Sequence, residues 1–178
     1  MASTFINKLE NISTPGTAPK LFLKKLGPIH FEWHHQHNLG LADIGFLLFH
    51  WELIQRFKKV GADAALGGIA PFSKPELATF HSPYTVNVAV GKQDTAALED
   101  FSSELESWHN DAHMNIGMAI HKDLMNPRTN VKIPEFWRLH YFINDRFEEK
   151  LTTFRSAASQ TIPATVAAVE ASSAATVV

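Results

Sequence analysis

Apolar residues recur every three or four positions along four long stretches of the chain, which is the spacing of an amphipathic helix. The pattern predicts helices over about residues 27–38, 41–61, 94–121 and 133–154. The first of these begins at Gly27 and Pro28, because proline is favoured in the first turn of a helix. The predicted fold class is therefore mainly α, an antiparallel four-helix bundle with long loops.

The segments between these helices carry the residues of loops and turns. Residues 1–19 mix Ser, Thr, Pro and Gly with scattered apolar residues, and we expect an irregular lead-in. Residues 62–82 contain paired glycines and two prolines and are predicted to form a loop, as are residues 122–132. Valines alternate with other residues within 83–91, which allows a short strand.

The C-terminal residues differ in composition from the rest. Residues 156–178 are rich in Ala, Ser, Thr and Val and contain no aromatic residue. Such a segment has too few large apolar groups to offset the entropy lost on ordering. The predicted organisation is one helical domain over residues 1–155, followed by a disordered or loosely packed tail over residues 156–178.

Composition and charge exclude several classes of protein. Of the 178 residues, 45% are hydrophobic and 19% charged, and the formal net charge is −2, so no basic field favours nucleic acid or an anionic membrane. No apolar stretch approaches the 18 or so residues of a membrane span, and no leader-like segment opens the chain. Cysteine is absent, which excludes disulfides and thiolate ligands. We expect a cytoplasmic protein that binds neither nucleic acid nor membrane.

Several histidines occupy positions of these predicted helices where apolar residues are expected. The chain has ten, and two of them, His109 and His113, are four residues apart in ESWHNDAHMNIGMAIH. Side chains at this spacing lie about 5–6 Å apart on one face of a helix, so both can reach one metal ion. The same pattern, a pair followed by a third histidine on the next helix, occurs in both halves of the chain: His30, His34 and His50, then His109, His113 and His140. Buried imidazole nitrogens need partners, which a metal ion supplies.

The residues around these histidines favour copper. A helical di-iron site normally uses Glu-x-x-His motifs from two helices with further glutamates, whereas only one such motif ends on a histidine of these two sets, Glu106 to His109. Neutral imidazoles suit copper better than hard cations. Three alternatives stay open: a hemerythrin-like di-iron protein, histidines that serve only as hydrogen-bonding core residues, and His37 as a ligand in place of His30 or His34.

Four segments resemble the copper motifs of the type-3 binuclear copper proteins, which include hemocyanins, tyrosinases and catechol oxidases. The similarity is greatest to the copper domain of arthropod hemocyanin and prophenoloxidase, and it covers roughly residues 27–60 and 98–154. HFEWH resembles the first HxxxH motif with its aromatic residue, and WHNDAH resembles the HNxxH motif. FLLFHWELIQRF and IPEFWRLHYFIND are similar to the segments around the third histidine of each set.

The resemblance implies that His30, His34 and His50 bind one copper ion and that His109, His113 and His140 bind the other. It also implies that O2 binds between the two copper ions as co-substrate. In oxidase members the centre then oxidises a phenolic, catecholic or aminophenolic small molecule. The alternative within the family is a reversible O2 carrier without turnover.

The resemblance further implies a catalytic role for Asn110, which follows the first histidine of the second set. In tyrosinases the asparagine at this place helps to hold a water that accepts a proton, and Glu106 or Asp111 could share that water here. The chain departs from the family where Ile133 replaces an aspartate and where Asn144 stands at an acidic position. It also lacks the domain that covers the copper pair in the arthropod proteins, so we expect the site to be open to substrate.

Overall fold

The computed structural model describes residues 2–37, 44–87 and 95–161, and within these ranges the chain forms helices and no strands. The expectation of a mainly α fold is confirmed. None of the described helices is long and apolar enough to cross a membrane. The helices are α1 (Ala2–Ile12), α2 (Pro19–His37), α3 (Gly45–Lys59), α4 (Ala62–Ala65), α5 (Lys74–Thr79), α6 (Thr95–Ala119) and α7 (Pro134–Thr161), with two 3₁₀ turns, η1 (Lys122–Met125) and η2 (Asn130–Lys132), before α7.

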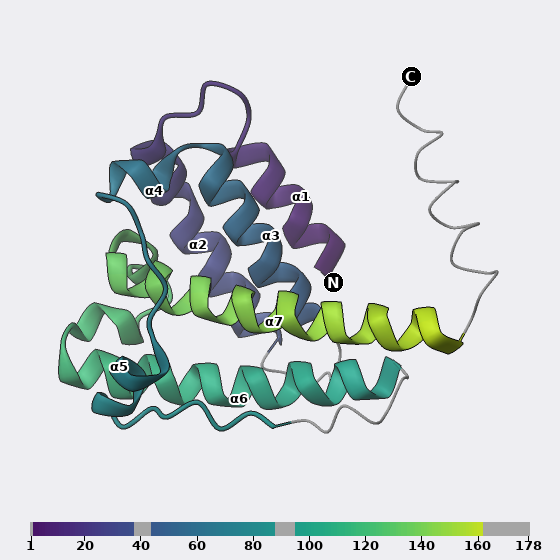
Figure 1. The fold of residues 1–178 in the computed structure, drawn as a ribbon. Coiled ribbons are helices and arrows are strands. Elements are labelled where there is room, and N and C mark those ends of the chain that lie inside the picture. The colour runs from purple at the N-terminus through teal and green to yellow at the C-terminus, as the bar shows by residue number, and fades with distance from the viewer. Residues whose placement is uncertain (1, 38–43, 88–94, 162–178) are drawn as a thin grey trace, which may run out of the picture.

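The long helices pack in two groups (Figure 1). Helix α1 packs on both α2 and α3, while α6 and α7 lie alongside each other in opposite chain directions. Helix α3 contacts both α6 and α7, and η2 contacts both α2 and α7. The two groups therefore meet along α3 and the η1–η2 segment.

Helix α1 occupies much of the segment expected to be irregular, so that expectation is wrong. Phe5 and Leu9 lie one turn apart and are almost completely buried. The ring of Phe5 meets Phe49 of α3 edge-on, with centroids 6.3 Å apart. Thr4 and Asn7 are exposed positions of the helix, where polar side chains are expected. Phe5 and Leu9, at helical spacing, lie on the face that docks it.

Helix α2 begins at Pro19, so its predicted start at Gly27 and Pro28 is also wrong. Pro28 lies inside the helix, although proline lacks the N–H that would bond to the preceding turn. Gly27 is needed for a close contact, because a Cβ atom at this position would lie 2.2 Å from the carbonyl oxygen of Arg128. The Gly–Pro pair therefore marks the place where the segment before α7 packs against α2.

The predicted loops contain short ordered elements. Within residues 62–82 lie α4 and α5, and α5 starts with a capping box between Ser73 and Glu76. The strand allowed over 83–91 does not form over 83–87, which has no regular structure, and residues 88–91 lie outside the described part.

The end of α7 lies beyond the predicted domain boundary at residue 155. The helix continues to Thr161, and the rest of the predicted tail, residues 162–178, lies outside the described part of the chain. Disorder of this tail stays a prediction.

Aromatic residues fill the space between the helices. Trp33 of α2 stacks on Phe49 of α3 with ring centroids 4.4 Å apart, and Phe57 of α3 stacks on Trp137 of α7 at 3.6 Å. Burying a large apolar side chain contributes about 1.5–3 kcal/mol. These contacts hold α2, α3 and α7 against one another and fix the positions of the histidines between them.

Candidate metal centre

Six histidines from four helices converge in the interior. Helix α2 contributes His30 and His34, α3 contributes His50, α6 contributes His109 and His113, and α7 contributes His140. We call these six residues the histidine cluster. The ring centroids of His109 and His113 are 4.4 Å apart, and even those of His30 and His140 are only 6.1 Å apart. All of them are buried except His34, which is half-buried.

Two members of the cluster are oriented by their own helices. His50 and His140 each follow a phenylalanine one turn earlier, Phe46 and Phe136. The Nδ1 atom of His50 donates to the carbonyl oxygen of Phe46 at 2.8 Å, and that of His140 donates to Phe136 at 2.7 Å. The phenylalanine rings also pack against the imidazoles, with centroids 4.3 and 3.9 Å apart. Both Nε2 atoms therefore point away from these carbonyl groups.

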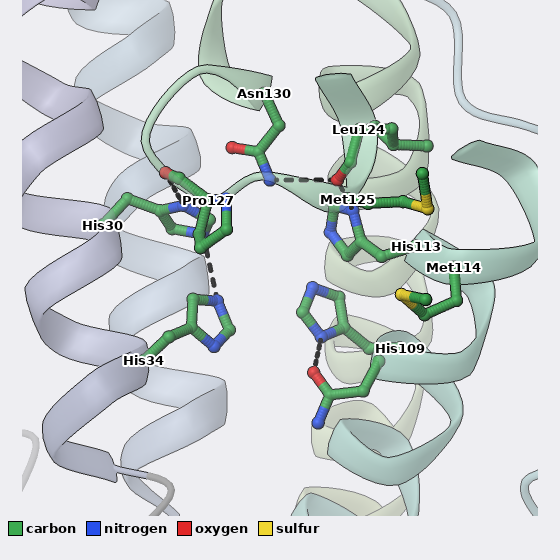
Figure 2. Close-up of a pocket in the computed structure, with 10 residues that line it drawn as sticks. His30, His34, His109, His113, Met114, Leu124, Met125, Pro127 and Asn130 are labelled. Atoms are coloured by element: carbon green, nitrogen blue, oxygen red, sulfur yellow. Dashed lines mark hydrogen bonds between the residues drawn. The ribbon is translucent and has the colours of Figure 1, made fainter. Parts of the chain in front are cut away.

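Two further members are oriented by the segment between α6 and α7. The Nδ1 atom of His30 donates to the carbonyl oxygen of Pro127 at 3.0 Å, and that of His113 donates to Leu124 at 2.9 Å (Figure 2). The amide nitrogen of buried Asn130 also donates to the Leu124 oxygen, at 3.3 Å. One short segment thus holds a histidine of α2 and a histidine of α6.

Asn110 orients a fifth member. Its side-chain oxygen lies 3.1 Å from Nδ1 of His109. Carbonyl and amide oxygens only accept hydrogen bonds, so the imidazole Nδ1 must carry the proton. The same reasoning applies to the other four rings with such a partner. In their neutral form, these five histidines have an Nε2 atom with a free lone pair, as a metal ligand requires.

The Nε2 atoms of two pairs lie close together. Those of His30 and His34 are 3.1 Å apart, and His34 can donate a hydrogen bond to His30 because none of the described residues places a carbonyl oxygen at its Nδ1 atom. Those of His109 and His140 are 3.3 Å apart. Both of these rings already use their Nδ1 proton, so in the neutral state two lone pairs face each other. This contact is unfavourable unless a cation lies between the nitrogens.

Two other buried nitrogens of the histidine cluster, Nε2 of His50 and Nε2 of His113, have no hydrogen-bond partner among the described residues. A buried polar atom without a partner costs free energy, on the order of 1–3 kcal/mol. The cluster therefore combines unpartnered acceptors with a lone-pair contact. Both features are compatible with a role of these side chains as metal ligands.

Protonation does not relieve these contacts. Burial lowers the pKa of His109 and of His140 well below the usual 6.5, and repulsion by neighbouring imidazoles lowers each further. Burial lowers the pKa of His30 to about 4, although its bond to Pro127 opposes the shift, and lowers that of His113 to about 3. The cluster is neutral at pH 7.

Among the described residues, one ring nitrogen from each of three histidines can be chosen so that the three nitrogens lie within 4.8 Å of one another in two cases. One group is His30, His34 and His50. The other is His50, His109 and His140. The first group coincides with the first predicted ligand set. The second contains two members of the second predicted set, with His50 in the place of His113. His113 nevertheless lies against both His109 and His140, its ring centroid 5.3 Å from that of His140.

His37, the alternative ligand, has a different environment. It stacks on Trp33 with ring centroids 4.4 Å apart, and its Nε2 atom lies 3.2 Å from a carboxylate oxygen of Glu106. It belongs to neither group of potential ligands. Glu106, one of the two acids considered as a partner of Asn110, thus contacts His37, while Asp111 is exposed.

A pocket of about 210 Å³ leads from the surface to the cluster (Figure 2). We call it the histidine pocket. None of the described residues that line it is Asp, Glu, Lys or Arg. They are His30, His34, His109, Asn110, His113, Met114, Leu124, Met125, Pro127 and Asn130.

Sequence reasoning missed the groups that hold the histidines in place. The carbonyl oxygens of Leu124 and Pro127 belong to a segment that was predicted only as a loop. Asn130, whose side-chain oxygen is buried without a partner, also went unnoticed. Backbone acceptors leave no residue-type signal, so the sequence could show only side chains: Asn110, which was singled out, and the phenylalanines at i−4 whose rings pack on His50 and His140.

Comparison of the chain with models of known protein families, with characterised proteins and with solved structures gives no match. Its function is therefore inferred from the histidine cluster and the histidine pocket.

Proposed function

We propose that the histidine cluster binds two copper ions and that the protein uses O2 to oxidise a small phenolic, catecholic or aminophenolic molecule. Helices α2, α3, α6 and α7 would then form a four-helix bundle around the dicopper centre. His30, His34 and His50 are the proposed ligands of one ion, and His109, His113 and His140 those of the other. This assignment agrees with the resemblance to the type-3 copper proteins.

The contact between His109 and His140 carries the proposal. Their Nε2 atoms lie 3.3 Å apart, and both Nδ1 protons are given to carbonyl or amide oxygens. Two nitrogens bound tetrahedrally at about 2.0–2.1 Å from one ion lie about 3.3–3.4 Å from each other. The spacing and the tautomers thus both suit a shared cation.

The chemistry of the donors supports copper. Within the described residues, neither group of potential ligands contains a carboxylate. Imidazole suits copper, zinc, iron and nickel, whereas a helical di-iron site brings several glutamates. At a given nitrogen site the affinity order of divalent ions favours copper. A di-iron centre is correspondingly disfavoured.

The histidine pocket supports an enzyme acting on a small neutral molecule. It has room for a single substituted ring, and it reaches His34 and His109 from solvent without a charged side chain in its described wall. Copper, when bound, supplies O2 binding and electron transfer. The chain's residues position the ring against the ligands and limit access to molecules of this size.

Asn110 is the proposed residue for handling the substrate proton. Its side-chain oxygen is used by His109, which leaves its amide nitrogen to hold a water at the pocket. A phenol must lose its proton to react, and a positioned water can receive it. We favour Asp111 as the supporting acid, because Glu106 contacts His37.

Copper loading followed by an oxygen-uptake assay tests the proposal. Metal-free protein should take up two copper ions and then consume O2 in the presence of catechol, o-aminophenol or a monophenol. His140→Gln should lower the copper content, while the exposed His121→Gln should not. One zinc ion or two iron ions bound in preference to copper would contradict the metal assignment. Two copper ions with reversible O2 uptake and no oxidation of any of these compounds would indicate a carrier.

A further inference from the structure

Three of the four methionines of the chain lie close together in the sequence, at positions 114, 118 and 125. Met114 and Met125 both line the histidine pocket, beside His109 and His113. Met114 is 49% exposed, although its side chain is apolar. Two thioether groups therefore stand between solvent and the histidine cluster.

The backbone of α6 lets these methionines approach. Met114 and Gly117 are three residues apart on α6, and Met125 ends η1. A Cβ atom at Gly117 would lie 2.6 Å from Cγ of Met125, so the absence of a side chain there allows Met125 to lie against the helix. In Figure 2 the sulfur atoms of Met114 and Met125 are on the same side of the pocket, next to His113.

His113 offers a third donor at the same place. Its Nδ1 atom is fixed by the Leu124 carbonyl oxygen, and its Nε2 atom is buried without a hydrogen-bond partner. It is also the one cluster member outside both groups of closely spaced nitrogens. His113 thus lines the pocket together with the two methionines and also packs against the inner pair, His109 and His140.

Thioether and imidazole donors without a carboxylate favour soft, singly charged ions. Cu(I) prefers thiolate and thioether ligands, whereas hard cations require carboxylate and carbonyl oxygens. The described wall of the histidine pocket contains no Asp or Glu. The donors at its mouth are therefore suited to Cu(I) and to its analogue Ag(I).

We propose that Met114, Met125 and His113 form an entry site for Cu(I), from which the ion passes to the inner histidines. The proposal rests on the proposed function, because it names the oxidation state in which copper reaches that centre. Binding by the methionines can nevertheless be measured independently of any oxidase activity. No change in the oxidation state of the metal is needed for this transfer.

Titration with Ag(I) tests the site directly. In metal-free protein carrying ¹³C-labelled methionine methyl groups, Ag(I) should shift the methyl signals of Met114 and Met125 but not that of Met118. Met118 is the matched control, since it lies one turn after Met114 on the same helix, is 66% exposed and does not line the pocket. Absence of any shift at Met114 and Met125 would overturn the proposal.

Substitution separates the entry site from the cluster. The double variant Met114→Leu with Met125→Leu keeps side-chain volume, which limits the effect on folding. It should take up Cu(I) from a competing chelator at least about tenfold more slowly, the lower end of the effect of losing a supporting group at a metal site. The final copper content should be unchanged. Met118→Leu should behave like wild type.

The outcomes distinguish this inference from the proposed function. Two bound copper ions with an unchanged uptake rate in the double variant would overturn the entry site and leave the dicopper proposal standing. If Ag(I) shifts the methyl signals of Met114 and Met125 but the histidines bind no copper, the dicopper proposal would be overturned and the methionine site would stand.

Discussion

His30 on α2 and His113 on α6 are oriented by carbonyl oxygens only three residues apart in the chain, those of Pro127 and Leu124. The two histidines belong to different proposed ligand sets. The η1–η2 segment therefore acts on both sets at once, and a displacement of this segment should disturb both.

Gly27→Ala should produce such a displacement. The new methyl group would meet the Arg128 carbonyl oxygen at 2.2 Å, a contact with backbone that cannot rotate away. We expect a net loss of stability, since overpacking costs about 1–3 kcal/mol and exceeds the helix propensity gained, which is about 1 kcal/mol or less. Copper content should fall as Pro127 moves away from His30. Chemical denaturation and metal analysis measure the two effects.

Gly117→Ala is the matched control, because it also adds a methyl group to a glycine inside a helix. There the close atom is Cγ of Met125, which belongs to a flexible side chain. The control should cost less stability and leave the copper content at its wild-type value. Equal losses in both variants would mean that the contact at Arg128 has no special role.

Asn110→Leu should weaken metal binding, because it removes the acceptor that keeps the proton of His109 on Nδ1. Loss of such an orienting group typically costs 10–100-fold in metal affinity or activity. Asn110→Asp keeps an acceptor oxygen and should retain the affinity. Competition with a Cu(I) chelator measures it in both variants.

A second readout tests whether Asn110 also handles a proton. At saturating copper, Asn110→Leu should slow monophenol oxidation by roughly 10²-fold, the low end for general-base catalysis. Catechol oxidation should be slowed less, since catechols lose a proton more readily. Equal slowing of both substrates would leave Asn110 as a positioning residue for His109 alone.

Replacement of His37 tests the alternative ligand. His37→Gln should retain two copper ions, because its imidazole contacts Glu106 and Trp33 and lies in neither group of closely spaced nitrogens. His34→Gln should lose copper from the first set. Metal analysis after loading and desalting distinguishes the two variants. Loss of copper in His37→Gln, with none in His34→Gln, would mean that His37 and not His34 is the ligand.

Acid should unfold the metal-free protein. The pKa of His30 is about 4 and that of His113 about 3 in the folded state, both lowered mainly by burial, against about 6.5 when unfolded. Below pH 6.5 the unfolded chain binds protons that the folded chain does not, so the free energy of unfolding falls as pH falls toward 4. Each such histidine contributes a slope of about 1.4 kcal/mol per pH unit.

Urea denaturation at several pH values measures this slope. His113→Leu removes one of the buried groups and should reduce this slope. A free energy of unfolding that does not change between pH 7 and pH 5 would contradict the burial of neutral histidines.

The sequence pattern was enough to predict α3, α6, α7 and the C-terminal part of α2, but not α1. The apolar stripes predicted for α3, α6 and α7 include their histidines, so any packing that buries these stripes also gathers the imidazoles. The predictions failed where a tertiary contact decides the outcome. Helix α1 depends on Phe5 and Leu9 meeting α3, and Pro28 is accommodated inside α2 near the contact between Gly27 and Arg128.

The assignment of ligands to sets was less predictable than their convergence. Spacing along a helix pairs His109 with His113, but the distance from His50 to these residues depends on how α3 packs on α6 and α7. The observed group of His50, His109 and His140 follows from that packing. Residue spacing within a single helix could not have predicted this group.

Four of the five acceptors that fix the imidazole tautomers are main-chain carbonyl groups, those of Phe46, Leu124, Pro127 and Phe136. Every amino acid supplies the same carbonyl group. Sequence drift at these positions can therefore proceed without loss of the acceptors, provided the backbone keeps its path. Asn110 alone of the five is open to loss by a single codon change. The acceptors that orient these imidazoles thus depend mainly on the path of the backbone. Two chains with the same backbone path could share them with little more sequence in common than their histidines.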